Sequence, residues 1–385
     1  MERRHQRQRG DRNVLHEDSH GVYDAGVHRL YSRALSVTTL IIYLGCGGQG
    51  SPASPGQTPG TTTPPAQVDP LRDAARSAGK KVGAAVQSGY LADGRYTSVL
   101  SRHFNYLTAE YEMKWATIEP SQGVRNFSPA DNIVGYGQAS GMEIKGHTLI
   151  WHGSTPNWLS SLSPSDFRTA FEAHIRAVGE HFRGRVYAWD VVNEAIADSG
   201  AGLRDTIFRQ KLGDTYIADA FRLAHQADPQ ALLFYNDYSG EGLNAKSDRI
   251  YDLVRGLKGQ GVPIDGVGLQ MHITAWNPPS ESAVASNMRR LADLGLLVNI
   301  SEMDVRIRDL PGTPQTKLDA QKAVYKSMVS VCVAEPRCDA VTFWGFTDAH
   351  SWIDSQYGAD DPLLFDEQYA AKPAFYGVFD AFMRR

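Results

Sequence analysis

The stretch VYAWDVVNE, residues 186–194, is an apolar run that ends in an amide and an acid. Residues 297–304, LVNISEMD, repeat this arrangement and end with Glu302 and Asp304. One carboxylate at the end of a buried strand could be a coincidence, whereas two such strands suggest a pair of carboxylates directed at one pocket. Paired carboxylates cleave glycosidic bonds, because one protonates the leaving oxygen while the other attacks or activates water. The hypothesis is therefore that Glu194 and Glu302 are catalytic.

Around these two stretches, short apolar runs alternate with amphipathic segments of helical period. Strands separated by helices predict parallel βα units that close into a (β/α)8 barrel, the TIM barrel. A doubly wound open sheet is the alternative, but no Gly-rich phosphate turn follows the first predicted strand. The predicted strands are Val82–Val86, Tyr106–Ala109, Glu143–Ile150, Val186–Val192, Leu232–Tyr235, Gly266–Met271, Leu297–Ile300 and Ala340–Trp344. The predicted helices include Asp166–Phe182, Tyr216–Ala227, Ser247–Gly256, Ser282–Leu294 and Thr316–Ala334.

The N-terminal part differs in composition from this pattern. Within residues 1–46, basic residues precede an apolar run that ends just before Cys46, as in a secretory signal or a bacterial lipoprotein. An ordinary signal with an incidental cysteine and an uncleaved apolar anchor are the alternatives. Residues 47–70 are rich in Gly, Ser, Pro and Thr and predict a disordered linker. We expect one catalytic domain over residues 71–385, in a protein that is secreted or held at the cell surface by a lipid on Cys46.

Composition excludes several functional classes. The chain has 385 residues, 42% of them hydrophobic, and a formal net charge of −4, which gives no electrostatic footprint for nucleic acid. His147, His152 and His272 could suggest a metal enzyme, but the helical His-Glu-x-x-His arrangement is missing from the sequence. We therefore expect a monomer that uses neither a metal nor a cofactor.

Polar and aromatic residues gather at the ends of seven of the eight predicted strands. Active sites of (β/α)8 barrels lie at the C-terminal ends of the strands, so these residues predict one shared site. They are Glu110, Tyr111 and Lys114; His147, Trp151 and His152; Asn193 and Glu194; Asn236 and Asp237; Gln270 and His272; Glu302 and Asp304; and Trp344, Asp348, His350 and Trp352.

These residue types match the needs of a retaining glycosidase, whose two carboxyl groups lie about 5–5.5 Å apart. An indole such as Trp151 would desolvate an acid and raise its pKa. The amide of Asn193 could bond the sugar 2-hydroxyl, a contact that strengthens in the transition state. A histidine could orient the nucleophile if a third group, such as Asp237, fixes its tautomer. Trp344 and Trp352 offer flat apolar faces to sugar rings.

Five segments resemble those of family 10 glycoside hydrolases, which are mostly endo-β-1,4-xylanases. The order and spacing of the segments agree with that family from about Leu71 to Phe382, which covers nearly the whole predicted domain. The segments are GHTLIWH (146–152), WDVVNEA (189–195), GVGLQMH (266–272), ISEMDV (300–305) and FWGFTDAHSW (343–352).

The resemblance implies that the chain hydrolyses internal bonds of xylan with retention of configuration. It implies Glu194 as acid/base and Glu302 as nucleophile, with Asp237 and His272 as the relay that holds Glu302. Spacing alone leaves open whether Cys332 and Cys338 are two buried thiols or a disulfide, and the resemblance favours the disulfide. The implied substrate-binding residues are Glu110, Lys114, His147, Trp151, Asn193, Gln270, Trp344 and Trp352.

Two positions depart from the family. Tyr111 stands where the family usually has Asn, and Gly153-Ser154 replaces a frequent Ser-Gln. The missing amides would bond the sugar one step beyond the cleaved residue on the glycone side, so this subsite should be weakened or reshaped, with Tyr111 filling it or stacking there. Drift of this subsite without a change of substrate is the favoured interpretation. A β-glucan, a short xylo-oligosaccharide or a plant glycoside, cleaved by the same mechanism, is an alternative substrate. A catalytically inactive barrel that binds sugar is a further alternative. Such a protein would be expected to lose one carboxylate, whereas both are present here.

Overall fold

The strands of the computed structural model, within the described residues 69–200 and 202–384, form a closed parallel barrel. Strands β1 to β6 pair in sequence order, β6 pairs with β8, β8 with β9, and β9 returns to β1. This closure confirms the predicted (β/α)8 fold and excludes the open sheet. The barrel strands are β1 (Lys81–Val86), β2 (Tyr106–Ala109), β3 (Glu143–Trp151), β4 (Ala188–Asn193), β5 (Leu232–Asp237), β6 (Gly266–Leu269), β8 (Leu297–Arg306) and β9 (Cys338–Phe343).

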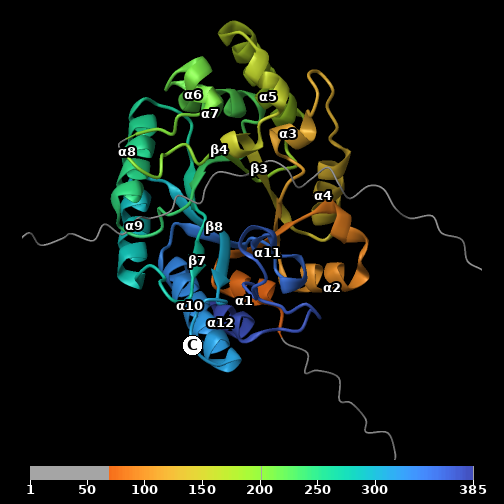
Figure 1. The fold of residues 1–385 in the computed structure, drawn as a ribbon, viewed down its shortest axis with the longest axis vertical. Coiled ribbons are helices and arrows are strands. Elements are labelled where there is room, and N and C mark those ends of the chain that lie inside the picture. Colours follow the sequence, from red (N-terminus) through yellow and green to blue (C-terminus); the bar gives the residue numbers. More distant parts are fainter. Residues whose placement is uncertain (1–68, 201, 385) are drawn as a thin grey trace, which may run out of the picture. The chain divides into compact units, whose positions relative to one another are not determined.

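Helices surround the strands (Figure 1). The longer ones begin where the sequence supplies caps: the Ser163 side chain accepts the Asp166 N–H at the start of α5, and Asn244 forms a capping box on α8. The helices are α1 (Leu71–Ser77), α2 (Gly94–His103), α3 (Trp115–Ile118), α4 (Ser128–Ala139), α5 (Pro164–His181), α6 (Ile207–Leu212), α7 (Tyr216–Ala227), α8 (Ala245–Gly259), α9 (Glu281–Asp293), α10 (Pro314–Ala334), α11 (Trp352–Tyr357) and α12 (Pro373–Phe382). Short 3-10 turns are η1 (Ser88–Ala92), η2 (His152–Ser154), η3 (Asn157–Ser161) and η4 (Asp348–His350).

The sixth strand differs from its prediction. It was expected to run to Met271, but β6 ends at Leu269 and the backbone at Met271 turns through a positive φ of 68°. The chain then forms β7 (His272–Thr274), which pairs with the outer end of β8. Leu269 pairs with Ile300 and His272 with Asp304, so β8 holds one more residue than its partner between these points. This irregularity turns His272 toward β8.

The seventh barrel strand, β8, is longer than predicted. The apolar pattern ends at Ile300, whereas the strand continues through Glu302 and Asp304 to Arg306. In its second half, Glu302, Asp304 and Arg306 alternate with Met303 and Val305, which are buried in the hydrophobic core.

A disulfide joins Cys332, near the end of α10, to Cys338 at the start of β9. The bond confirms the predicted pairing. It lies at the end of β9 opposite to the strand termini that carry the predicted site.

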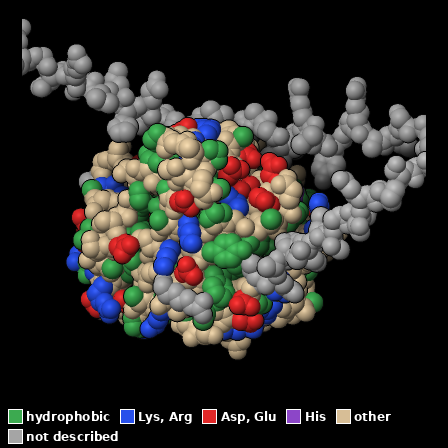
Figure 2. All heavy atoms as spheres, turned by 90° about the horizontal axis from the view of Figure 1, so that it is seen from below, with side chains coloured by type: hydrophobic (Ala, Val, Ile, Leu, Met, Phe, Trp, Pro, Cys, Tyr) green, Lys and Arg blue, Asp and Glu red, His purple; other side chains and the backbone are tan. Residues whose placement is uncertain are grey.

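The surface carries a mixture of charges. On the face seen in Figure 2, basic and acidic side chains are interspersed with apolar ones. None of the helices among residues 69–384 is both long and apolar enough to cross a membrane. The predicted N-terminal extension, Cys46 and the linker up to residue 68 lie outside the described residues.

Candidate active site

Glu194 directly follows β4 and takes a left-handed backbone conformation, with φ of 58°. Such a conformation is unfavourable for a residue with a side chain and is often found at functional sites. Here it accompanies a carboxylate held by three donors. Glu194 Oε2 accepts the Trp151 indole N–H at 2.8 Å, and Oε1 accepts from the amides of Asn193 at 3.1 Å and Gln270 at 3.0 Å.

Glu302 lies on β8 and is 4% exposed. Its Oε1 accepts the Asn236 amide at 2.6 Å, and its Oε2 accepts the His272 Nε2–H at 3.2 Å. His147 Nδ1 lies 3.9 Å from Oε1. Gly268 makes room for this arrangement, because a Cβ there would lie 2.1 Å from Asn236 Oδ1.

Amide side chains connect the two glutamates. Asn193 Oδ1 accepts hydrogen bonds from Asn236 at 2.8 Å and from Gln270 at 3.2 Å. Asn236 also donates to Glu302, and Gln270 also donates to Glu194. The structure therefore brings the two predicted carboxylates into one hydrogen-bonded network at the C-terminal ends of β4, β5, β6 and β8.

Charge in this network favours an ionised Glu302. Burial alone would raise the pKa of Glu302, but the hydrogen bond from His272 and nearby positive charge outweigh burial and lower it to about 2. Burial would likewise lower the pKa of His272, yet the charges and hydrogen bonds of Asp304 and Glu302 raise it to about 10. At neutral pH the pair is thus an imidazolium beside a carboxylate, which suits a nucleophile.

The third member of this group is Asp304, and the prediction of Asp237 for that place is wrong. His272 Nδ1 donates to Asp304 Oδ2 at 2.7 Å, and the Trp352 indole N–H donates to the same oxygen at 2.8 Å. The alternation of side chains between the two faces of a strand explains why Asp237 does not bond His272. Asn236 faces Glu302, so its neighbour Asp237 points to the other side of β5.

Asp237 has a different, buried environment. It accepts the Tyr235 hydroxyl at 2.5 Å and forms an ion pair with Lys246 at 3.0 Å. Burial raises the pKa of Asp237 to about 6, although Lys246 acts against the rise. These contacts connect the end of β5 to the start of α8.

Lys114 lies near the catalytic pair and near Glu110, whose charges act on its ammonium group. Lys114 Nζ lies 4.7 Å from the ring centre of Tyr111, 4.6 Å from that of Trp151 and 5.8 Å from that of Trp344. Burial lowers the pKa of Lys114, against the opposing influence of Glu110 and both catalytic glutamates. Glu110 accepts the Gln87 amide at 3.1 Å.

His147 and the two predicted tryptophans enclose the nucleophile. The Trp344 ring contacts the His147 ring edge to face at 5.0 Å, and Trp352 contacts His272 in the same way at 4.9 Å. His147 Nδ1 is bonded to Asp190 at 3.0 Å, and Lys145 forms a buried ion pair with Asp190 at 2.8 Å.

Sequence reasoning noted Asn236 and Asp304 at strand ends but gave neither a role, and it overlooked Asp190 and Lys145. The alternation of side chains along a strand could have identified Asp304 from the sequence. Asp304 lies two residues after Glu302 on one strand, so both side chains share a face.

Comparison with known proteins agrees with this geometry. The model of the family described as "Glycosyl hydrolase family 10" matches residues 70–381. Endo-1,4-beta-xylanase B of Thermotoga neapolitana is 41% identical over 315 residues, which cover 80% of this chain and 90% of the relative. An endo-1,4-beta-xylanase of Agaricus bisporus is 39% identical, over 80% of this chain and 93% of its own.

Solved structures give the same result. Xylanase 10B of Thermotoga petrophila RKU-1, in complex with xylobiose, superposes with a TM-score of 0.79 at 38% identity and covers 83% of this chain and 98% of its own. Native xylanase 10B of Thermotoga maritima gives a TM-score of 0.78 at 39% identity, with 82% and 98% covered.

Proposed function

Because this chain belongs to glycosyl hydrolase family 10, we propose that it is a retaining endo-β-1,4-xylanase that cleaves internal xylosidic bonds. The xylanase names of its relatives support the substrate. The single observation that supports the mechanism best is the contrast between the two carboxylates. Glu302 is held by an imidazolium, whereas Glu194 is held by amides and an indole, all of which are neutral donors.

In the first step, Glu302 attacks the anomeric carbon while Glu194 gives its proton to the departing glycosidic oxygen. The carbon–oxygen bond to the leaving sugar breaks, and a covalent ester to Glu302 forms. His272 stabilises the ionised nucleophile before attack through its Nε2–H, and Asp304 keeps that imidazole charged and oriented. The leaving sugar departs with a new hydroxyl.

In the second step, Glu194 removes a proton from water as the water oxygen attacks the anomeric carbon. The ester bond breaks, and Glu302 becomes a carboxylate again. Two inversions at one carbon give net retention. The Asn193 amide donates one N–H to Glu194, and its second N–H is proposed to bond the 2-hydroxyl of the reacting sugar.

Two measurements test this function. Proton NMR of products released from xylan oligosaccharides should show the β-anomer first, with the α-anomer appearing only by mutarotation. A 2-deoxy-2-fluoro xylobioside with a good leaving group should label the peptide that contains Glu302. Initial release of the α-anomer, or a label on another peptide, would contradict the proposal. Glu302→Gln with near-native activity would do so too.

We further propose that the chain is exported, acts as a monomer, and is anchored at the cell surface by a lipid on Cys46. The charged and apolar order of residues 1–46 supports this location. Expression with a labelled fatty acid should mark the wild-type protein and not Cys46→Ser, which should be released from the membrane fraction. An unlabelled, fully soluble wild-type protein would contradict the anchor. Light scattering should give the mass of one chain.

A further inference from the structure

Arg306 ends β8 on the same face as two residues of the active site. Side chains two residues apart on a strand point the same way, so Glu302, Asp304 and Arg306 form one row. At about 3.3 Å per residue, the Arg306 Cα lies about 13 Å along the strand from that of Glu302. Arg306 is therefore too far away to touch the reacting sugar, and the mechanism above leaves it without a role.

The Arg306 guanidinium is packed between two aromatic rings. Its Cζ lies 4.1 Å from the ring centre of Tyr357 and 5.6 Å from that of Trp276. Tyr357 in turn contacts Trp352 edge to face at 5.9 Å. Rings thus connect Arg306 to Trp352, whose indole donates to Asp304 beside the nucleophile.

Within residues 69–384, the Arg306 guanidinium has neither a hydrogen bond nor an ion pair with an acceptor. The acids near it along the chain accept hydrogen bonds from other residues, although the charge of Arg306 also acts on Asp309. Asp309 accepts both arms of Arg308, at 3.0 and 3.1 Å. Asp360 accepts the backbone N–H groups of Ile307 and Arg308, at 3.1 and 2.9 Å. Arg306 is only partly buried, so its planar fork can receive an acceptor from outside the chain.

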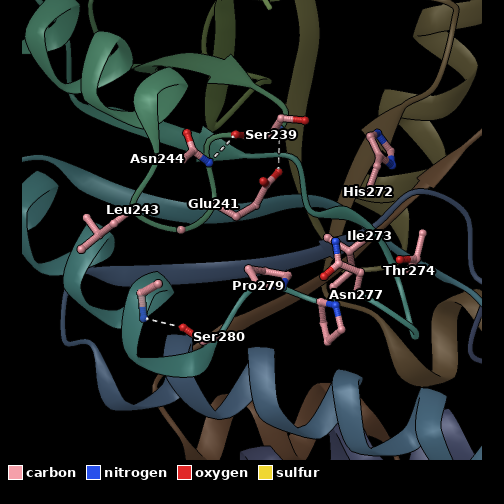
Figure 3. A pocket seen from close by; sticks show the side chains of 13 residues that line it. Ser239, Glu241, Leu243, Asn244, His272, Ile273, Thr274, Asn277, Pro279 and Ser280 are labelled. Atoms are coloured by element: carbon pink, nitrogen blue, oxygen red, sulfur yellow. Dashed lines mark hydrogen bonds between the residues drawn. The ribbon is translucent and has the colours of Figure 1, made fainter. Parts of the chain in front are cut away.

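The surroundings of Arg306 suit a sugar. Trp276 is 39% exposed and can offer its face to a pyranose ring. Thr274, which pairs with Arg306 between β7 and β8, lines a hollow of about 500 Å³ together with Asn277 and His272. Figure 3 shows these residues along the wall opposite Glu241 and Asn244. Arg306 pairs with Thr274 and Trp276 precedes Asn277, so both adjoin residues that line this hollow together with His272 of the active site.

We propose that Arg306 and Trp276 form a subsite for a hexuronic acid branch on the polysaccharide. A guanidinium fork recognises a carboxylate through paired hydrogen bonds, and the indole stacks on the branch sugar. The backbone of xylan carries no charge, so an arginine whose guanidinium has no acceptor among the described residues would select an acidic side group. This subsite rests on the xylanase function proposed above and adds a preference for acidic substrates.

The test compares a xylan that carries hexuronic acid branches with the same xylan after reduction of its carboxyl groups to alcohols. Wild type should show a kcat/KM about tenfold higher on the acidic form, the range of one hydrogen-bonded charge. In Arg306→Gln this ratio should fall to about one. Trp276→Ala should lower kcat/KM on both substrates alike, because the branch sugar is present in both. Raising the ionic strength should lower the wild-type ratio.

Arg255→Gln is the matched control, because Arg255 lies over the Tyr251 ring at 5.4 Å on α8 and its loss changes the net charge equally. It should keep the wild-type ratio. Arg306→Lys keeps the charge without the planar fork, so its ratio should fall even if Arg306→Gln folds poorly. A wild-type ratio of one, or a ratio retained in both Arg306 variants, would overturn the subsite. Failure of wild type to hydrolyse either xylan would instead refute the xylanase function.

Discussion

Asp304 accepts the His272 Nδ1–H at 2.7 Å, and the opposite nitrogen of the same ring points at Glu302. The imidazole therefore joins two acids of one strand. Its charge depends on both, and the nucleophile depends on its charge.

Asp304→Asn should lower kcat by roughly 10- to 100-fold, the range found when the hydrogen-bonding partner of a metal-ligating histidine is lost. The pKa of His272, followed by NMR of the ring protons, should fall toward its ordinary value because the main negative charge beside it is gone. Asp237→Asn is the matched control at the other predicted acid. It should destabilise the fold by leaving Lys246 without one of its partners, while the pKa of His272 stays near 10. If Asp237→Asn instead lowered the pKa of His272 and Asp304→Asn left it unchanged, Asp237 would be the acid that orients His272.

His272→Gln should move the acid limb of the pH profile of kcat/KM to higher pH. Glu302 acts as a carboxylate, and its pKa of about 2 lies below the ordinary 4.5, so wild type loses activity only as the pH falls toward 2. Without the imidazolium, the pKa of Glu302 rises and protonation stops the reaction at milder acidity. The limb should shift by about one unit or more. An unchanged limb, measured on an aryl xylobioside, would show that His272 does not set the pKa.

Tyr111→Asn should strengthen binding on the glycone side. Tyr111 is 44% exposed, and its ring lies over Lys114, where an amide would instead offer hydrogen bonds to a sugar. We expect kcat/KM on an aryl β-xylobioside to rise about fivefold, the equivalent of one hydrogen bond of about 1 kcal/mol. An aryl β-xyloside, which lacks the second sugar, should show little change, and Tyr111→Phe controls for the hydroxyl. If Tyr111→Asn weakens the xylobioside reaction, the tyrosine ring itself is the binding surface.

Gly153→Ala should impair the acid/base through Trp151. A Cβ at Gly153 would lie 2.5 Å from the Trp151 ring, so the indole would have to move. Because that indole donates to Glu194 Oε2, its displacement should lower kcat on aryl xylosides by about fivefold, the cost of one hydrogen bond. Gly89→Ala is the control, since nothing lies within 4 Å of a Cβ there. Equal activity of both variants would mean that the indole adapts without loss of its bond.

Replacing both cysteines, as Cys332→Ala with Cys338→Ala, should lower the free energy of unfolding by about 2 kcal/mol. The estimate follows from the short loop that the bond closes, with a sequence separation of 6. Activity at 25 °C should remain, because the disulfide lies away from the strand ends that carry the site. Denaturant unfolding of the variant and of reduced wild type should agree. A loss of activity without a loss of stability would contradict this separation.

The barrel was predictable because its inner strand segments are apolar and its helices keep a regular period. Helix α7, Tyr216–Ala227, agrees with its predicted bounds. The outer half of β8 and the break after β6 were not predictable from that pattern. Glu302 and Asp304 face the active site although Met303 and Val305 pack in the core, and the turn at Met271 depends on the register with β8.

The two catalytic glutamates were predictable because an acid at the end of an apolar run has few structural uses. The choice between Asp237 and Asp304 was harder, since both follow apolar strands. The face of the strand on which each acid lies decides which of them can bond His272. On β5 the face toward Glu302 is occupied by Asn236, which bonds that carboxylate. Trp276, Arg306 and Tyr357 come from three separate segments, so no local sequence pattern predicts that they form a cluster.

The alternation along β8 carries an evolutionary consequence. The nucleophile, the relay acid and the arginine occupy every second position of β8, and the residues between them, Met303 and Val305, are buried in the core. The strand therefore has to keep its alternation of side chains to keep both sets in place. A single residue inserted or deleted between Glu302 and Asp304 would turn the Asp304 side chain to the other face of β8. The His272 imidazole would then lose its hydrogen bond to Asp304. An insertion between Glu302 and Asp304 would therefore have to be absorbed by a bulge that keeps both acids within reach of His272.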